Sequence, residues 1–123
     1  MSASTAARGP RSRPSLAWIT IRLTALALAI LVLTHFAVTH LLTDVAETDS
    51  AFVAERWQSG IVATTDWLML VTAVLHAGAG LWTVVDDYIR ASRRRAIRGL
   101  IVLVGTVMVV GGTVTLLVVL GRS

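Results

Sequence analysis

The chain contains no cysteine and no lysine, and its 123 residues include one tyrosine and two prolines. Without cysteine, the protein has no disulfides, no thiolate metal sites and no cysteine nucleophile. Charged residues form only 15% of the chain, whereas hydrophobic residues form 55% and lie in long blocks. This composition excludes a nucleotide-binding α/β enzyme and is typical of helices that cross a membrane.

Three blocks carry no formal charge: residues 23–42, 67–85 and 99–121, with 20, 19 and 23 residues. A helix needs about 20 apolar residues to cross the hydrocarbon core of a bilayer. Nothing in these blocks resembles the alternating segments of a barrel strand. The sequence therefore predicts an all-α integral membrane protein whose domain, residues 15–121, has three transmembrane helices over about 17–43, 60–88 and 96–121.

Nine of the eleven arginines lie on one side of these spans, before or at the start of the first and after the second. The loop over residues 43–66 is instead acidic. By the positive-inside rule we predict a protein of the cytoplasmic membrane with its N-terminus in the cytoplasm and its C-terminus outside. Residues 1–14 are predicted to form a disordered cytoplasmic tail. Residues 50–57 favour a short interfacial helix.

His76 lies near the middle of the second span, where an ionisable group is costly. A neutral imidazole at that depth either hydrogen-bonds a neighbouring helix or ligates a metal or haem iron. Four small residues follow it over positions 77–80. They either leave room for a flat macrocycle beside the imidazole or let helices pack closely.

Asp87 follows His76 by eleven residues, about 20° short of three full turns, so both side chains lie on one helical face about 16 Å apart. Next to it, Tyr88 can donate a hydrogen bond to a carbonyl oxygen. The alternative is that this pair only forms a salt bridge with Arg90 or Arg94 and belongs to an interfacial belt.

Three residues within the first predicted span are ionisable. Arg22 lies at the membrane level of Asp87 and either binds a carboxylate, such as a haem propionate, or extends to lipid phosphates. His35 and His40 are about 140° apart on a straight helix and are not expected to share one metal. They leave open a second haem or a distal quinone site at the outer side.

The second span resembles a known family signature. Over residues 75–88, the spacing of His76, Gly80, Trp82, Asp87 and Tyr88 is similar to that in the small hydrophobic membrane-anchor subunit of succinate dehydrogenase, a cytochrome b556-type anchor. An arginine followed by a Thr-Ala pair at the start of helix one, here over residues 22–25, is also similar to that family. Both motifs stand in the helices where the family has them.

The resemblance implies a site for each residue that it covers. His76 is expected to be an axial ligand of a b-type haem iron shared with a second membrane-anchor subunit. Arg22 is expected near a haem propionate, and Tyr88 with Asp87 in a quinone site near the cytoplasmic face. The expected partners are this second anchor subunit, an iron–sulfur subunit and a flavoprotein subunit, together in one multi-subunit bundle.

The expected function is therefore a membrane-anchor subunit of succinate:quinone oxidoreductase, or respiratory complex II, which is not an enzyme on its own. The chain has no flavin-binding glycine motif and no cysteine for iron–sulfur ligation, so electrons must come from partners. One alternative is a small transport or channel subunit in which Arg22, His40 and Asp87 line a proton or ion path. Another is a purely structural anchor with a vestigial haem site.

Overall fold

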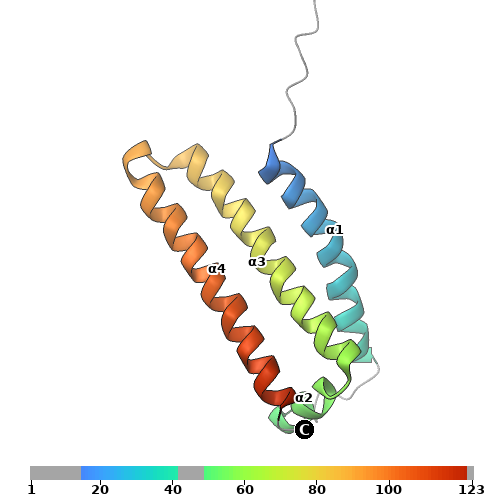
Figure 1. Ribbon diagram of the computed structural model, residues 1–123. Coiled ribbons are helices and arrows are strands. Elements are labelled where there is room, and N and C mark those ends of the chain that lie inside the picture. The colour runs from blue at the N-terminus through green and yellow to red at the C-terminus, as the bar shows by residue number, and fades with distance from the viewer. Residues whose placement is uncertain (1–14, 42–48, 122–123) are drawn as a thin grey trace, which may run out of the picture.

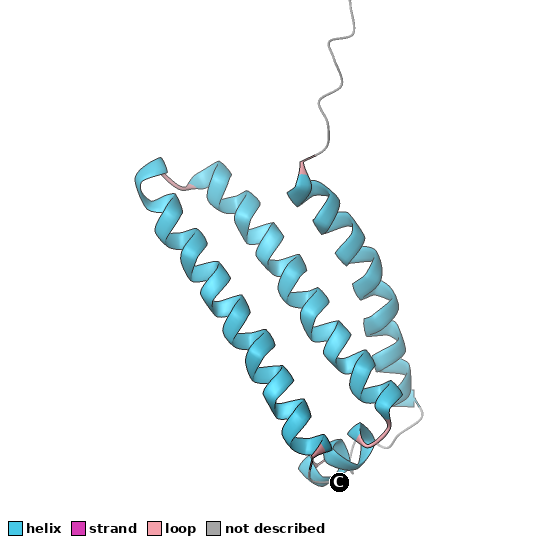
Figure 2. Ribbon diagram, viewed as in Figure 1, coloured by secondary structure: helices cyan, strands magenta, loops and turns pink. Residues whose placement is uncertain are grey.

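The described part of the chain is almost entirely helical. In this computed structural model, residues 15–41 and 49–121 are described, and the predicted tail over residues 1–14 lies outside them. Within these ranges there is no strand (Figure 2). The helices are α1 (Leu16–Phe36), which continues as the π-helical turn η1 (Ala37–Leu41), then α2 (Ser50–Trp57), α3 (Gly60–Tyr88) and α4 (Ala91–Leu120).

The predicted all-α class with three long spans is confirmed. Three helices are long and apolar enough to cross a membrane: Leu16–Leu41, Gly60–Tyr88 and Ala91–Leu120. The short helix expected over residues 50–57 is present as α2. The region expected as an acidic loop, residues 43–66, differs in part, because α2 and the first turns of α3 occupy residues 50–57 and 60–66.

Local side-chain and backbone geometry explains where the helices begin. The Ser15 hydroxyl accepts a hydrogen bond from the Trp18 amide at 3.2 Å, and the Asp49 carboxylate accepts one from the Phe52 amide at 2.8 Å. These are N-caps of α1 and α2. At the other turn, Ile89 and Arg90 are extended and separate α3 from α4.

The third long helix begins at Ala91, whereas the sequence predicts it from about residue 96. Arginine is a good helix former, and two extended residues are enough to reverse the chain here. Most of the basic cluster therefore lies on the first turns of a helix rather than in a loop. Its side chains consequently have defined positions around the α4 axis.

The three long helices lie side by side with α3 between α1 and α4 (Figure 1). The start of α1, the end of α3 and the start of α4 lie at one end, which we call the arginine-rich end (Figure 1). The short helix α2 lies at the opposite end and contacts α3 and α4.

Very little of this arrangement is buried. Among the described residues, only Ala63, Val85 and Thr39 are buried, and large apolar side chains such as Leu26 and Leu103 are about two thirds exposed, at 65% and 59%. Contiguous apolar surface on this scale belongs in contact with lipid or with other subunits. The layer is therefore one part of a larger membrane assembly or is bathed by lipid.

Small residues and one polar contact bring α3 and α4 together. A Cβ at Gly105 would lie 3.1 Å from Val74 Cγ1, and one at Gly112 would overlap Leu70. The Trp67 indole donates to the Thr113 hydroxyl at 2.9 Å between the same helices. Close approach at small residues with an occasional polar bond is how helices pack within a membrane.

Candidate functional site

His76 projects from the middle of α3 toward α1. Its Nδ1 atom lies 2.9 Å from the Thr24 hydroxyl, and the imidazole is only half-buried. The hydrogen bond to a neighbouring helix, one of the two interpretations of this histidine, is therefore present. It uses one ring nitrogen and leaves the other for a second role.

The hydrogen bonds around Thr24 determine which ring nitrogen remains available. Thr24 Oγ1 donates its single proton to the Thr20 carbonyl oxygen at 2.6 Å. With that proton on the Thr20 carbonyl, the hydroxyl oxygen can accept from Nδ1–H of His76, and this is the tautomer that leaves the lone pair on Nε2. Nε2 has no hydrogen-bond partner in residues 15–41 and 49–121. A histidine tied through Nδ1 with a free Nε2 has the form of a metal ligand with its supporting bond.

His76 is a single nitrogen donor. Within the described ranges, no group of three or more His, Cys, Asp or Glu side chains is placed to hold a metal ion. Around His76, the described residues thus provide one nitrogen donor rather than a multidentate ion site.

The small residues after His76 divide between two faces of α3. Gly78 faces α4, where an added Cβ would meet Ile101 Cγ2 at 3.9 Å, whereas a Cβ at Gly80 would have nothing within 4 Å. Gly80 lies about 40° from His76 around the helix. The expectation of one side-chain-free surface over residues 77–80 is therefore correct only for the His76 side, and Gly78 serves helix packing instead.

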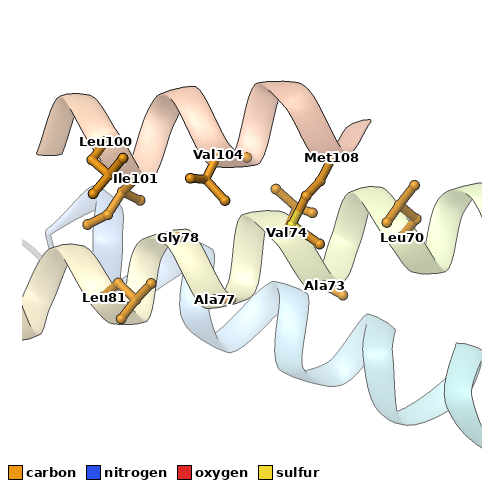
Figure 3. Close-up of a pocket in the computed structure, with 11 residues that line it drawn as sticks. Leu70, Ala73, Val74, Ala77, Gly78, Leu81, Leu100, Ile101, Val104 and Met108 are labelled. Carbon is orange, nitrogen blue, oxygen red and sulfur yellow. The ribbon is translucent and has the colours of Figure 1, made fainter. Parts of the chain in front are cut away.

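An apolar groove lies between α3 and α4 next to this face. It has a volume of about 440 Å³. In Figure 3, Leu81, Leu100 and Ile101 gather at one end and Leu70, Val74 and Met108 at the other. Its floor includes Ala77 and Gly78, directly after His76. Such a surface suits a macrocycle edge, an isoprenoid chain or an apolar helix.

The residues expected at the rim, Asp87 and Tyr88, end the same helix. Because α3 is continuous from Gly60 to Tyr88, the spacing argument that places Asp87 on the His76 face applies. Tyr88 is 81% exposed, and Asp87 is exposed too. Neither makes a hydrogen bond or ion pair with any residue that the structure describes. Both side chains are free to meet a ligand or another subunit.

The ion pair at this end forms at the neighbouring carboxylate. Arg98 pairs with Asp86, and its guanidinium stacks over the Trp82 ring at 4.7 Å. Arg94 donates from Nε to the Ile89 carbonyl oxygen at 2.7 Å. The alternative in which Asp87 pairs with Arg90 or Arg94 is thus absent from the described contacts. Asp86 thus has a cationic partner, and Asp87 has none among the described residues.

Arg22 lies on α1, two residues before Thr24. Its guanidinium is exposed and stacks over the Trp18 ring at 4.3 Å. It forms no hydrogen bond or ion pair with a described residue. Two residues turn a helix by about 200°, so Arg22 and Thr24 leave α1 in different directions. The structure therefore does not bring Arg22 directly beside His76, but its charge is available to an external carboxylate.

A charged cluster at the opposite end, which we call the Asp66 cluster, was not predicted from the sequence. The Asp66 carboxylate accepts from His35 Nδ1 at 2.8 Å and from Arg56 and Trp57, each at 2.9 Å. It joins α1, α2 and α3 and is mostly buried, with Asp66 14% and Arg56 16% exposed. The signal that could have revealed it is an aspartate directly before an apolar block, in a segment expected to be a loop.

The remaining histidine, His40, is separate from both groups. It lies in η1, is exposed, and packs edge-to-face on Phe36 with ring centroids 4.7 Å apart. His35 and His40 thus have different partners, in line with the expectation that they do not share a metal. Arg22 lies in the second turn of α1, and Asp87 at the end of α3, far from His40 at the other end of the layer.

A known protein family matches most of the chain. The family model described as "Succinate dehydrogenase/Fumarate reductase transmembrane subunit" matches residues 7–119. No curated protein matches the chain. The matched range includes nearly all of the three long helices and every residue of the His76 and Tyr88 region described above.

Proposed function

The chain belongs to the succinate dehydrogenase/fumarate reductase transmembrane subunit family, and from this premise we propose that it helps to bind haem b and quinone and anchors the flavoprotein and iron–sulfur subunits. The observation that carries the proposal is the orientation of His76. Its Nδ1 atom is tied to Thr24 and its Nε2 atom is free, at the middle of a membrane-spanning helix.

The residues present fit a haem. The free Nε2 of His76 supports axial ligation, and the open surface at Gly80 supports close approach of a flat ring. Because this chain offers one nitrogen ligand, we propose that a second anchor subunit would supply a further ligand. The guanidinium of Arg22, which bonds to no described residue, supports a role in binding a propionate.

With a haem bound beside His76, each of these residues would have a separate role. His76 would hold the iron through Nε2, and Thr24 would keep the imidazole in the required tautomer and rotation. When bound, haem supplies one-electron chemistry. The apolar walls of the neighbouring groove exclude water from this depth of the membrane.

We place the quinone at the arginine-rich end, against Tyr88. Its exposed phenol can donate to a quinone carbonyl oxygen, and the adjacent Asp87 carboxylate is exposed and has no partner among the described residues. The ion pair of Asp86 with Arg98 keeps the second carboxylate of this turn out of that role. The iron–sulfur subunit is proposed to dock at the same end, because this chain has no cysteine with which to hold an iron–sulfur cluster beside the quinone.

The test is purification of the complex through a tag on this chain, followed by a dithionite-reduced minus oxidised visible spectrum and identification of the copurifying proteins. A b-type signal together with flavin and iron–sulfur subunits supports the proposal. Copurification of those subunits without haem would support the anchor role but contradict the haem role of His76. If both haem and partner subunits are absent, and the purified chain shows pH-driven ion flux, a transport subunit is favoured instead.

Replacing Tyr88 with Phe is expected to slow quinone reduction about tenfold. The change removes one hydrogen-bond donor, worth about 1 to 3 kcal/mol when its acceptor is left unpaired. Because Tyr88 is 81% exposed and bonded to no described residue, the helix and the assembly should be unaffected. The measurement is the rate of quinone reduction relative to the rate of succinate oxidation with a water-soluble artificial acceptor.

That ratio contains its own control, since the artificial acceptor takes electrons without the quinone site. A variant with both rates lowered equally would indicate damaged assembly and not a lost donor. An unchanged ratio would remove Tyr88 from the quinone site.

A further inference from the structure

A cationic pocket lies at the arginine-rich end, on the turn between α3 and α4. It has a volume of about 400 Å³ and is lined by Trp82, Arg94, Arg95 and Arg98, with Ala91 at the start of α4. Residues 86–98 contain five arginines and two aspartates, and one of those aspartates is already paired. The pocket therefore carries excess positive charge.

The donors in this pocket are incompletely used. Arg98 Nε is buried and has no hydrogen-bond partner among the described residues. Arg94 uses only Nε, toward the Ile89 carbonyl, and Arg95 bonds to no described residue. Several guanidinium donors thus surround a space that contains no protein acceptor for them. An anion with several oxygens, such as a phosphate, matches this set.

Trp82 joins this pocket to a long apolar groove. The same indole also lines a groove of about 790 Å³ that runs along α3 between α1 and α4. Leu16 and Thr20 line it on one side and Val102 and Val109 on the other, with Ala79 on its α3 side. The groove extends from the arginine-rich end into the membrane-spanning part of the layer.

The groove lies on the face away from the haem site proposed above. On α3 it uses Leu75, Ala79 and Trp82, which lie about 60° to 120° from His76 on the side opposite to Gly80 and Ala77. The groove therefore lies beside His76 and does not include it. This site does not rest on the haem or quinone proposal.

We propose that the pocket and the groove together bind one anionic phospholipid. Its phosphate lies among Arg94, Arg95 and Arg98, and its acyl chains lie along α3 between α1 and α4. Basic pockets beside transmembrane helices bind the head groups of anionic lipids, and the apolar groove gives the chains a place directly below the head group. A free phosphate would use the arginines but not the groove.

The test uses the full-length chain with its copurifying subunits, extracted in mild detergent. Phosphatidylglycerol and phosphatidylcholine with identical acyl chains are added in equal amounts, and the lipid retained per chain is measured by mass spectrometry. Phosphatidylglycerol should be retained preferentially. Arg95→Gln should lower its retention about fivefold, the effect typical of one basic residue near an anionic lipid.

Arg93→Gln is the matched control. Arg93 is exposed, carries the same charge on the same turn of α4 and does not line the pocket, so its replacement should leave retention unchanged. Ala79→Phe tests the other half of the site, because it fills the groove without changing any charge and should also lower retention. Excess inorganic phosphate should not displace the lipid.

Four outcomes would overturn the proposal. Equal retention of the two lipids would show no head-group selection, and equal losses in Arg93→Gln and Arg95→Gln would indicate diffuse surface attraction. Displacement by inorganic phosphate, or normal retention in Ala79→Phe, would indicate an anion site without a lipid. Loss of copurifying subunits from Arg95→Gln with unchanged lipid would make the arginines a protein-docking surface.

Discussion

Replacement of His76 with Ala is expected to remove the b-type haem absorbance from the purified complex. The free Nε2 atom is the nitrogen ligand that this chain offers at the middle of its central helix, and alanine has no group to replace it. Haem content per flavin, measured as the pyridine haemochrome, should fall to near zero. A variant that retains the wild-type spectrum would contradict the ligand role and favour a structural anchor.

Thr24→Val separates ligand loss from helix loosening. His76→Ala also breaks the bond between α1 and α3, which is worth about 1 kcal/mol. Thr24→Val breaks the same bond but keeps the imidazole. We expect it to retain haem with a raised midpoint potential, because the histidine loses the bond that makes it a stronger donor. Thr24→Ser, which keeps the hydroxyl, should restore the potential. Equal haem loss in His76→Ala and Thr24→Val would mean that packing, and not ligation, holds the haem.

Replacement of Asp66 with Asn is expected to destabilise the end of the layer opposite to the arginines. The carboxylate accepts three hydrogen bonds, at 2.8, 2.9 and 2.9 Å, that join α1 and α2 to α3. The change leaves the Arg56 guanidinium, only 16% exposed, without its counter-charge. Removing one partner of a buried ion pair costs about 3 to 5 kcal/mol. Hydrogen exchange of residues 50–57 should rise, and the complex should unfold at a lower temperature.

Asp86→Asn is the matched control for this prediction. It removes the same charge from another ion pair on the same helix, but Asp86 is 40% exposed and its partner Arg98 is 32% exposed. A pair this open to solvent contributes about 0 to 1 kcal/mol, so this variant should leave α2 protected from exchange. Unchanged exchange in Asp66→Asn, or an equal effect of the two variants, would show that the Asp66 cluster does not hold α2 in place.

His76 and Asp87 on α3 illustrate which features a sequence predicts and which it does not. The spacing of His76 and Asp87 within one helix predicts a common face, because rotation and rise per residue are properties of the helix itself and α3 is continuous over both residues. The choice of ion pair at the end of that helix was not predictable in this way. It depends on where the first turns of α4 lie, and these turns present Arg98 to Asp86.

Three transmembrane helices, the all-α class and the family membership follow from features that are local in the sequence, namely uncharged blocks of sufficient length and two short motifs. Such features do not depend on how the helices are arranged in space. The bond of Thr24 to His76, the division of the small residues between two faces and the Asp66 cluster required the tertiary structure. Each depends on the axial shift and rotation of one helix relative to another. Side-chain packing between the helices sets these two quantities, and the residue pattern of a single helix does not reveal them.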